Sequence, residues 1–332
     1  MNRKAVGIVG LGAKLPARVF ENEEWTQYVD TSDEWIRTRT GIERRRIAGD
    51  DETTATLALG AAREALQSAE LDASQLDEII VATDTPEVYL PDTACFLQQG
   101  LGARTIPAFT LGGSGCAGFI QALDIATSRI RDRGGRVLVV GVELLSRIMD
   151  WRDRNTCVLF GDAAAAAILG TERPICELMA GTCGTDGEQI DILKLEVGGT
   201  RTPVTMDLVQ ARQHRNIVMK GTEVFRHAVS RMSQACSEVL EALDLQVDDV
   251  DLVIPHQANL RIIRSVARSV GVPMEKVYTN VEQYGNTGSA SVPLALYEAH
   301  SGGRIAPGSV VLLTAFGAGF HWAAAVLRFS EV

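Results

Sequence analysis

The apolar positions of this 332-residue chain change their spacing from one segment to the next. Short apolar runs at residues 79–82 and 137–141 are typical of buried strands. Residues 54–69 instead have apolar side chains at helical spacing, and residues 117–131 predict another helix that ends before a Gly-Gly pair. Because strands and helices alternate, we predict an α/β fold with layered sheets.

The same helix-then-strand pattern occurs twice along the chain. Residues 62–82 and residues 236–256 align without a gap, and their apolar positions coincide. An internal repeat of this kind indicates two copies of one structural unit. We therefore expect two related halves, residues 1–170 and residues 171–332.

One long segment, residues 184–216, has no clear periodicity and contains several Gly, Thr and Arg residues. Segments of this length without a pattern are commonly functional surface loops. We interpret it as an excursion over the surface, and a position over a substrate entrance is one hypothesis for it.

Composition narrows the classes of protein to consider. The chain has 46% hydrophobic and 22% charged residues and a net charge of −10, which disfavours nonspecific binding to nucleic acid or acidic membranes. No apolar run approaches the ~18 residues of a membrane span. Residues 5–9 predict a first strand and are too short a run for a signal peptide. The six cysteines form no Cys-x-x-Cys pair, so we expect a reducing cytoplasm.

Cys116 is the first candidate for chemistry. It lies in the glycine-rich segment 111–118, directly before the predicted helix. A helix N-terminus favours the thiolate, which is the nucleophilic form of cysteine, and glycines let a substrate approach the backbone. A small buried cysteine at a tight packing point would give the same pattern, so the structural alternative stays open here.

The repeat adds two partners to Cys116. The position equivalent to Cys116 in the second half is Ala290, in another glycine-rich turn that also contains Asn286. His256 follows the predicted strand 252–254, a location where α/β proteins often place functional groups. We therefore predict that two corresponding turns approach each other and that Cys116, His256 and Asn286 share one site.

At these motifs the chain resembles the β-ketoacyl-acyl-carrier-protein synthase III family, whose members initiate bacterial fatty-acid synthesis. The resemblance extends over essentially the whole chain and implies a five-layered αβαβα fold of the thiolase type. The segments that carry the resemblance are residues 30–42, 90–94, 116–118, 150–154, 159–162, 255–263, 284–287 and 315–322.

The resemblance implies an acyltransferase that works in two stages. Cys116 would take an acyl group from acyl-CoA, and the backbone N–H groups of Cys116 and Ala318 would stabilise the oxyanion. Malonyl-acyl carrier protein would then bind, with His256 and Asn286 stabilising the enolate that forms as CO₂ departs. This chemistry requires no metal, flavin or nicotinamide.

The resemblance also assigns binding residues. The residues expected at the nucleotide end of CoA are Trp35, Arg39, Arg154 and Asn259. An indole and a guanidinium can sandwich adenine, whereas ordinary surface aromatic and charged residues are the alternative interpretation. Leu90 and Phe316 are expected at the acyl pocket. The family forms homodimers through an edge strand, so Leu90 would reach the acyl pocket of the partner subunit.

A basic helix face follows His256. Arg261, Arg264 and Arg268 are spaced i, i+3 and i+7, so they share one side of a predicted helix. Because carrier proteins are acidic, a basic patch on this acidic enzyme would be a docking surface for them. The alternative is the solvated face of an ordinary amphipathic helix.

The chain also departs from the family pattern. The turn before Cys116 is one residue longer, Gly288 stands where Ser is common, and Ala163 and Ala165 replace frequent glycines. These changes leave Cys116, His256 and Asn286 in place, but they would alter the shape of the acyl pocket. Two alternatives therefore stay open: a specialised thiolase-fold acyltransferase, and a condensing enzyme of a secondary-metabolite pathway. A catalytically silent partner subunit is disfavoured because Cys, His and Asn are all present.

A competing motif, Gly10-Leu-Gly12, follows the predicted first strand and resembles a dinucleotide-binding turn. The third glycine of that fingerprint is missing, and Pro16 stands where a helix should begin. The sequence therefore argues against a nicotinamide site.

Overall fold

The computed structural model describes residues 5–331. The helices are α1 (Asp33–Thr40), α2 (Thr54–Ser68), α3 (Thr93–Leu101), α4 (Gly118–Arg133), α5 (Arg154–Cys157), α6 (Met206–Gln210), α7 (Gly221–Glu241), α8 (Leu260–Val270), α9 (Val281–Tyr284) and α10 (Ser291–Ser301). The strands are β1 (Gly7–Lys14), β2 (Arg18–Glu21), β3 (Arg44–Ile47), β4 (Glu78–Ala82), β5 (Ala108–Leu111), β6 (Val137–Leu144), β7 (Asp162–Gly170), β8 (Cys176–Thr185), β9 (Leu193–Leu195), β10 (Ile217–Met219), β11 (Leu252–Pro255), β12 (Val310–Gly317) and β13 (His321–Phe329). Two 3-10 turns matter for the site: η3 (Gly115–Ala117) and η9 (Gly288–Ala290).

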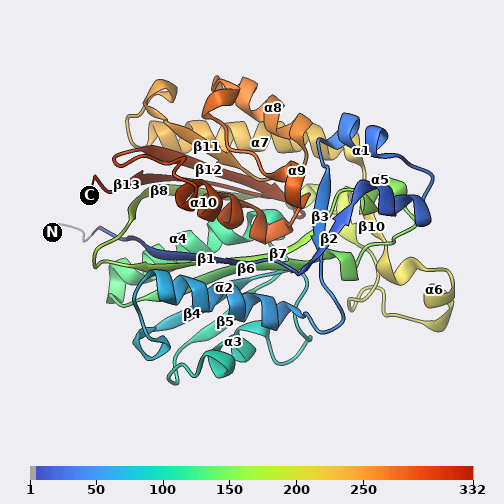
Figure 1. The fold of residues 1–332 in the computed structure, drawn as a ribbon, viewed down its shortest axis with the longest axis horizontal. Coiled ribbons are helices and arrows are strands. Elements are labelled where there is room, and N and C mark those ends of the chain that lie inside the picture. Colours follow the sequence, from blue (N-terminus) through green and yellow to red (C-terminus); the bar gives the residue numbers. More distant parts are fainter. Residues whose placement is uncertain (1–4, 332) are drawn as a thin grey trace.

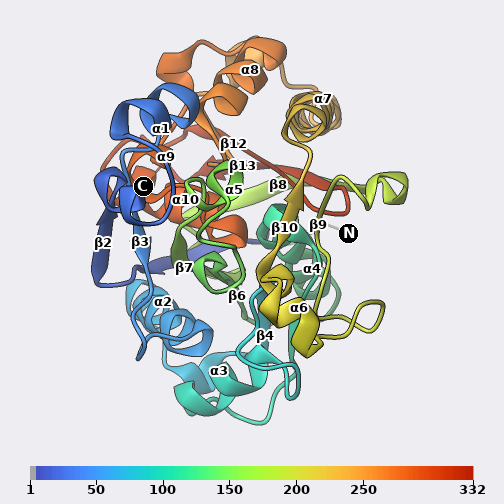
Figure 2. The same ribbon diagram turned by 90° about the vertical axis from the view of Figure 1, so that its right-hand side faces the viewer.

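Helices and strands form alternating layers, as the sequence predicted (Figure 1). Helices α2 and α3 cover one outer face, and α7 and α8 cover the opposite outer face (Figures 1 and 2). Helices α4 and α10 lie between the two groups of strands, and each packs against strands of both groups. The predicted α/β fold with layered sheets is confirmed.

The strand order repeats the same pattern on both sides of the molecule. Within the described residues the main sheet runs β11-β12-β13-β8-β1-β7-β6-β4-β5. Along β4-β6-β7-β1 the pairings are parallel, antiparallel and antiparallel, and the same succession holds along β11-β12-β13-β8. Strands β1 and β8 join the two groups. This order supports two related halves divided at residue 170, which we keep as a proposal.

The alanine run of β7 explains how two helix layers approach one strand. Successive side chains of a strand point to opposite faces. Ala163 and Ala165 pack with Leu294 of α10, whereas Ala164 and Ala166 belong to the cluster that includes α2. Small side chains on both faces let both helices lie close to the strand, so the two alanines that replace family glycines are accommodated in a fully buried layer.

Strand β1 differs from the sequence prediction in its bounds. It begins at Gly7 and continues to Lys14, so the Gly10-Leu-Gly12 segment is strand and forms no phosphate-binding turn. A Cβ added at Gly10 would lie 2.5 Å from the carbonyl oxygen of Ala65 in α2. These glycines therefore serve close packing of helix on strand.

The segment 184–216 contains more regular structure than its sequence pattern indicates. Its first residues belong to β8, and it includes β9 and α6. Strand β9 pairs antiparallel with β10, which follows the segment. Residues from both of these strands line the main pocket, so the excursion forms part of its wall. None of the described helices is both long enough and apolar enough to cross a membrane.

Candidate active site

Cys116, His256 and Asn286 line one pocket of about 1720 Å³. They come from three distant parts of the chain: turn η3 before α4, the end of β11, and the segment before η9. Turns η3 and η9 pack against each other, as the repeat predicted from the sequence. The tertiary fold therefore brings all three candidate residues to a single cavity.

The nucleophile turn is held against the end of β12. Gly115 has φ +55°, a left-handed conformation that favours glycine. A Cβ at Gly115 would lie 2.6 Å from the backbone nitrogen of Ala318, so only glycine allows this approach. The backbone N–H groups of Cys116 and Ala318 thus belong to two segments in direct contact, which suits a shared oxyanion site.

The protonation of Cys116 differs from the sequence expectation. Burial raises the pKa of its thiol, and the nearby carboxyl groups of Asp84 and Glu143 raise it further. From the sequence, the helix N-terminus beside Cys116 predicted that the thiolate would be favoured. Desolvation and two acidic neighbours outweigh that effect, so the resting cysteine is a thiol and its proton must be removed during acylation.

His256 is a neutral hydrogen-bond donor in this environment. Its Nδ1 lies 2.9 Å from the hydroxyl of Ser291, and that hydroxyl oxygen accepts a hydrogen bond of 2.7 Å from the Gln257 backbone N–H. The Ser291 hydroxyl hydrogen is therefore free to point to Nδ1, which leaves the imidazole proton on Nε2. Burial lowers the pKa of His256 to about 3.

The amide of Asn286 is oriented by its own turn. Its Oδ1 accepts a 2.9 Å hydrogen bond from the backbone N–H of Gly288. Its backbone is held by Phe160 and its neighbours, since Gly161 donates to the Asn286 carbonyl at 2.9 Å. Because this oxygen is engaged, the Asn286 Nδ2 hydrogens remain as donors, alongside the single Nε2–H of His256.

Two acidic residues of the site were not identified from the sequence. Glu143 is buried in β6 and accepts hydrogen bonds from the Thr85 hydroxyl at 2.7 Å and the Ser289 hydroxyl at 3.0 Å. Burial and the neighbouring Asp84 raise its pKa to about 8. The available signal was a lone Glu inside an otherwise apolar strand, and an Asp two residues after another apolar strand.

Glu143 also explains one departure from the family pattern. Gly288 has φ +56°, and a Cβ there would lie 2.5 Å from Cγ of Glu143. The glutamate side chain therefore occupies the space that a serine side chain at position 288 would need. Gly288 and Glu143 together shape the wall behind the nucleophile.

Trp35 lies at the outer part of the same pocket. The guanidinium groups of Arg39 and Arg154 lie 4.7 Å and 4.6 Å from the centroids of its rings. Trp35, Arg39 and Asn259 line the pocket, whereas Arg154 packs on the Trp35 indole and donates a hydrogen bond to the Asp30 carbonyl. The structure thus places the four predicted CoA-binding residues around one indole and its neighbours.

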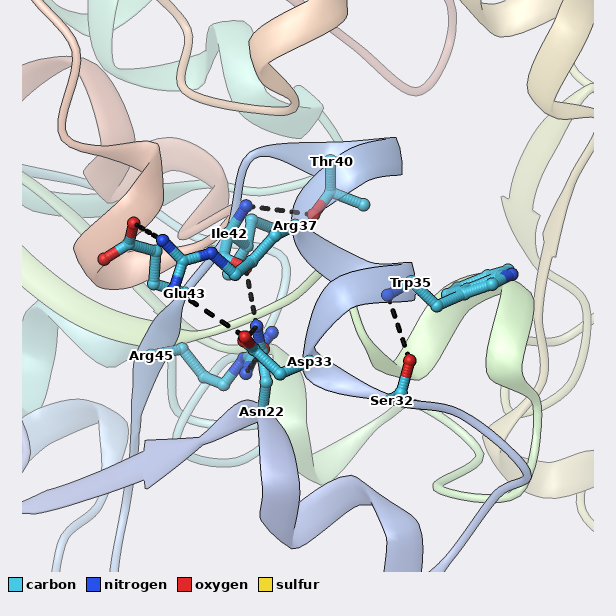
Figure 3. A network of polar contacts seen from close by, with 9 residues as sticks. All are labelled: Asn22, Ser32, Asp33, Trp35, Arg37, Thr40, Ile42, Glu43 and Arg45. Carbon is cyan, nitrogen blue, oxygen red and sulfur yellow. Dashed lines mark hydrogen bonds and ion pairs between the residues drawn. The ribbon is translucent and has the colours of Figure 1, made fainter.

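A polar network fixes the helix that carries Trp35 (Figure 3). Ser32 caps α1 by accepting a 3.1 Å hydrogen bond from the Trp35 N–H. The Asn22 amide donates to Asp33 at 2.8 Å and accepts from Arg45 at 2.7 Å. Arg45 is fully buried, and desolvation lowers its pKa to about 10. This buried network anchors α1 to β3.

The remaining predicted residues fall in different places. Phe316 is buried and lines the pocket, whereas Leu90 is 87% exposed and lies outside the pocket of its own chain. Arg261, Arg264 and Arg268 are exposed on α8 and form no ion pair with the described residues. Of these three arginines, Arg261 borders the pocket.

A layered α/β fold with a cysteine, a neutral histidine and an asparagine in one pocket defines a condensing enzyme of the thiolase type. A family model described as 3-oxoacyl-[acyl-carrier-protein] synthase III matches residues 113–187, and a second model, for the C-terminal part of the same family, matches residues 240–329. The chain belongs to this family of acyltransferase-type condensing enzymes.

Curated relatives and solved structures match the chain over nearly their whole length. The chain is 47% identical to a β-ketoacyl-[acyl-carrier-protein] synthase III of Roseiflexus sp. over 97% of this chain and 98% of the relative. The crystal structure of the Aquifex aeolicus synthase III matches with a TM-score of 0.90 at 43% identity, covering 98% of this chain and 100% of that one. A priming β-ketosynthase of a polyketide pathway matches with a TM-score of 0.87 at 35% identity, covering 99% and 97%.

Proposed function

We propose that this enzyme condenses an acyl-CoA primer with malonyl-acyl carrier protein, with loss of CO₂, to give a β-ketoacyl-acyl carrier protein. Cys116 carries the acyl group, and His256 and Asn286 donate hydrogen bonds to the malonyl thioester carbonyl. The observation that carries this proposal is the pairing of two neutral N–H donors with a thiol in one pocket. Such donors stabilise an enolate without removing a proton from carbon.

The binding residues follow from the same pocket. CoA enters past Trp35, Arg39 and Asn259, which line the pocket, and past Arg154, which packs on the Trp35 indole. The acyl thioester reaches Cys116 between the N–H groups of Cys116 and Ala318. Phe316 contacts the acyl group. An indole with guanidinium groups on it is a suitable surface for an adenine ring.

Two subunits complete the enzyme in this proposal. Strand β5 is an edge of the main sheet, so it can pair with the same strand of a second copy. The exposed side chains of Tyr89 and Leu90 would then be covered by the partner. Sedimentation that finds a fully active monomer would contradict this assembly.

The six cysteines are all free thiols, and we keep the cytoplasm as the expected compartment.

Carrier protein docks on α8 in this proposal. The three arginines of that helix are exposed and uncompensated by ion pairs with the described residues, and the helix starts close to His256. A local basic patch is needed because both proteins carry net negative charge.

One incubation tests the reaction. Wild-type enzyme is mixed with acyl-CoA and malonyl-acyl carrier protein, and enzyme and carrier are measured by intact-mass spectrometry. We expect one acyl adduct per chain on Cys116 and a β-ketoacyl product on the carrier, and neither with Cys116→Ala. An acyl adduct that persists in Cys116→Ala, or acyl transfer to an alcohol or amine without CO₂ release, would refute the assignment.

The same incubation addresses the second candidate function. The similarity to a polyketide priming synthase favours a condensing enzyme of a secondary-metabolite pathway as the alternative. Carrier proteins from the two kinds of pathway, offered in competition, would show which one the enzyme uses.

A further inference from the structure

Asp84 stands beside the nucleophile turn in a position that the proposed function has not used. It lies two residues after β4, and its carboxylate accepts a 2.8 Å hydrogen bond from the backbone N–H of Gly113. Gly113 belongs to the turn that leads to Cys116. Asp84 forms part of the pocket wall, and its side chain is exposed to the interior of the pocket.

Opposing effects act on the pKa of Asp84. Burial raises its pKa, whereas the N–H groups of Gly113 and Gly115 and the imidazole of His321 favour the charged form. The titratable groups that face it are Glu143 on β6, His321 on β13 and the thiol of Cys116. Because the pKa of Glu143 is raised to about 8, Glu143 holds a proton at neutral pH, and Asp84 is the carboxyl group of the pair that hydrogen-bonds to the nucleophile turn.

The thiol proton of Cys116 needs an acceptor, and His256 is poorly suited to that task. His256 is buried and strongly resists protonation. Its Nδ1 is engaged with Ser291, and the proposed function requires a proton on Nε2. Among the residues around the thiol, Asp84 is the carboxyl group that both lines the pocket and accepts a hydrogen bond from the nucleophile turn.

We propose that Asp84 is a further catalytic residue, which accepts the thiol proton of Cys116 during acylation and returns it to the departing CoA thiolate. The S–H bond of Cys116 breaks as an O–H bond forms on Asp84. The sulfur bonds to the acyl carbonyl carbon, the bond from that carbon to the CoA sulfur breaks, and the CoA thiolate takes the proton from Asp84. Charge and atoms balance without any other reactant. This inference rests on the proposed function.

Asp84→Asn separates proton transfer from turn geometry. The asparagine oxygen can still accept the Gly113 N–H, but the amide cannot take up a proton. We expect the rate of acylation at pH 7 to fall about 10²-fold, which is the usual range for losing a general base. The wild-type rate should fall at acidic pH as Asp84 is protonated. The variant should lose that limb and recover as the pH rises.

Two reagents distinguish this role from a structural one. Slow alkylation of Cys116 by iodoacetamide uses the thiolate formed in equilibrium with solvent, and Asp84→Asn removes a charge that opposes thiolate formation, so the variant should react at least as fast as the wild type. An aryl thioester, whose thiolate leaves unprotonated, should reduce the acylation deficit of the variant. A misplaced thiol would slow all three reactions together. Asp132→Asn, which removes an exposed carboxylate on α4, is the matched control and should behave as wild type.

The outcomes decide between the inference and its alternatives. If Asp84→Asn acylates faster than wild type, the carboxylate acts only by opposing thiolate formation, and the inference is overturned. If acylation is unchanged at every pH, Asp84 has no part in it. If the wild-type enzyme forms no acyl adduct at all, the proposed function fails instead. Release of CO₂ from malonyl thioester should be unaffected, because that step moves no thiol proton.

Discussion

Replacing Asn286 with Asp is the sharpest single test of the decarboxylation site. The side chain keeps its shape, and the carboxylate can still accept the 2.9 Å hydrogen bond from Gly288 that holds the turn. What changes is the group that faces the malonyl carbonyl, because an N–H donor becomes an oxygen that carries negative charge. The variant therefore alters the electrostatics of the enolate site while it leaves the local backbone in place.

The expected loss can be worked from the donors present. Removing one preorganised oxyanion donor typically costs about 10²–10³ in rate, or ~2.7–4 kcal/mol. His256 remains as the second donor, so Asn286→Ala should lose about that much. Asn286→Asp should lose at least as much, because a carboxylate repels the enolate as well as failing to donate.

The assay separates the two stages of the reaction. Acylation is followed by intact-mass measurement of the Cys116 adduct, and decarboxylation by release of labelled CO₂ from malonyl-acyl carrier protein. We expect acylation within about threefold of wild type for both variants, since the nucleophile and the Ala318 N–H are unchanged. If either variant releases CO₂ at the wild-type rate, the role assigned to Asn286 is wrong.

Four further outcomes are expected. Trp35→Ala should raise KM for acyl-CoA by about tenfold, on the scale of a lost cation–π and stacking contact, and KM for the carrier protein far less; equal effects on both would exclude a nucleotide site. Arg261→Glu should raise KM for malonyl-acyl carrier protein most strongly at low ionic strength, whereas acylation by free acyl-CoA stays the same; a salt-independent KM would move the docking face elsewhere. Leu90→Phe should shift preference toward shorter acyl groups, and an unchanged chain-length profile would remove Leu90 from the pocket. As pH falls from the ordinary His pKa of 6.5 toward about 3, unfolded chains protonate His256 and folded ones do not, so stability declines. Between pH 6.5 and 5 the free energy of unfolding of His256→Asn, measured with denaturant, should fall by about 2 kcal/mol less than that of the wild type. The same pH dependence of unfolding in both proteins would contradict a buried neutral histidine.

Local patterns along the chain were enough to predict the class of fold. The apolar runs at 79–82 and 137–141 lie in β4 and β6, and the helical spacing of 54–69 corresponds to α2 within one residue. These predictions succeed because a side chain's spacing along the chain sets which face it presents, independently of distant contacts. The motif resemblance led to the family, and the comparisons confirm it.

Cys116, His256 and Asn286 were also recognisable from the sequence, because turn chemistry and motif spacing are local properties. Their protonation was not. The helix N-terminus beside Cys116 can be read from the sequence, but the acidic neighbours that raise the pKa of its thiol come from the end of β4 and from β6. Burial is likewise a property of the packed molecule, and it is burial that keeps His256 neutral.

Contacts between segments far apart in the sequence were decided only by the tertiary structure. The Ser291 hydroxyl that accepts from Gln257 and faces Nδ1 of His256, and the Glu143 side chain that fills the space above Gly288, each join positions that no local pattern relates. Periodicity and motifs report which face a residue presents and which turn it can form. The electrostatic free energy of a buried group depends on every neighbour that packing brings to it, so the resting charge of Cys116 and the position of Asp84 beside it emerge only in the folded chain.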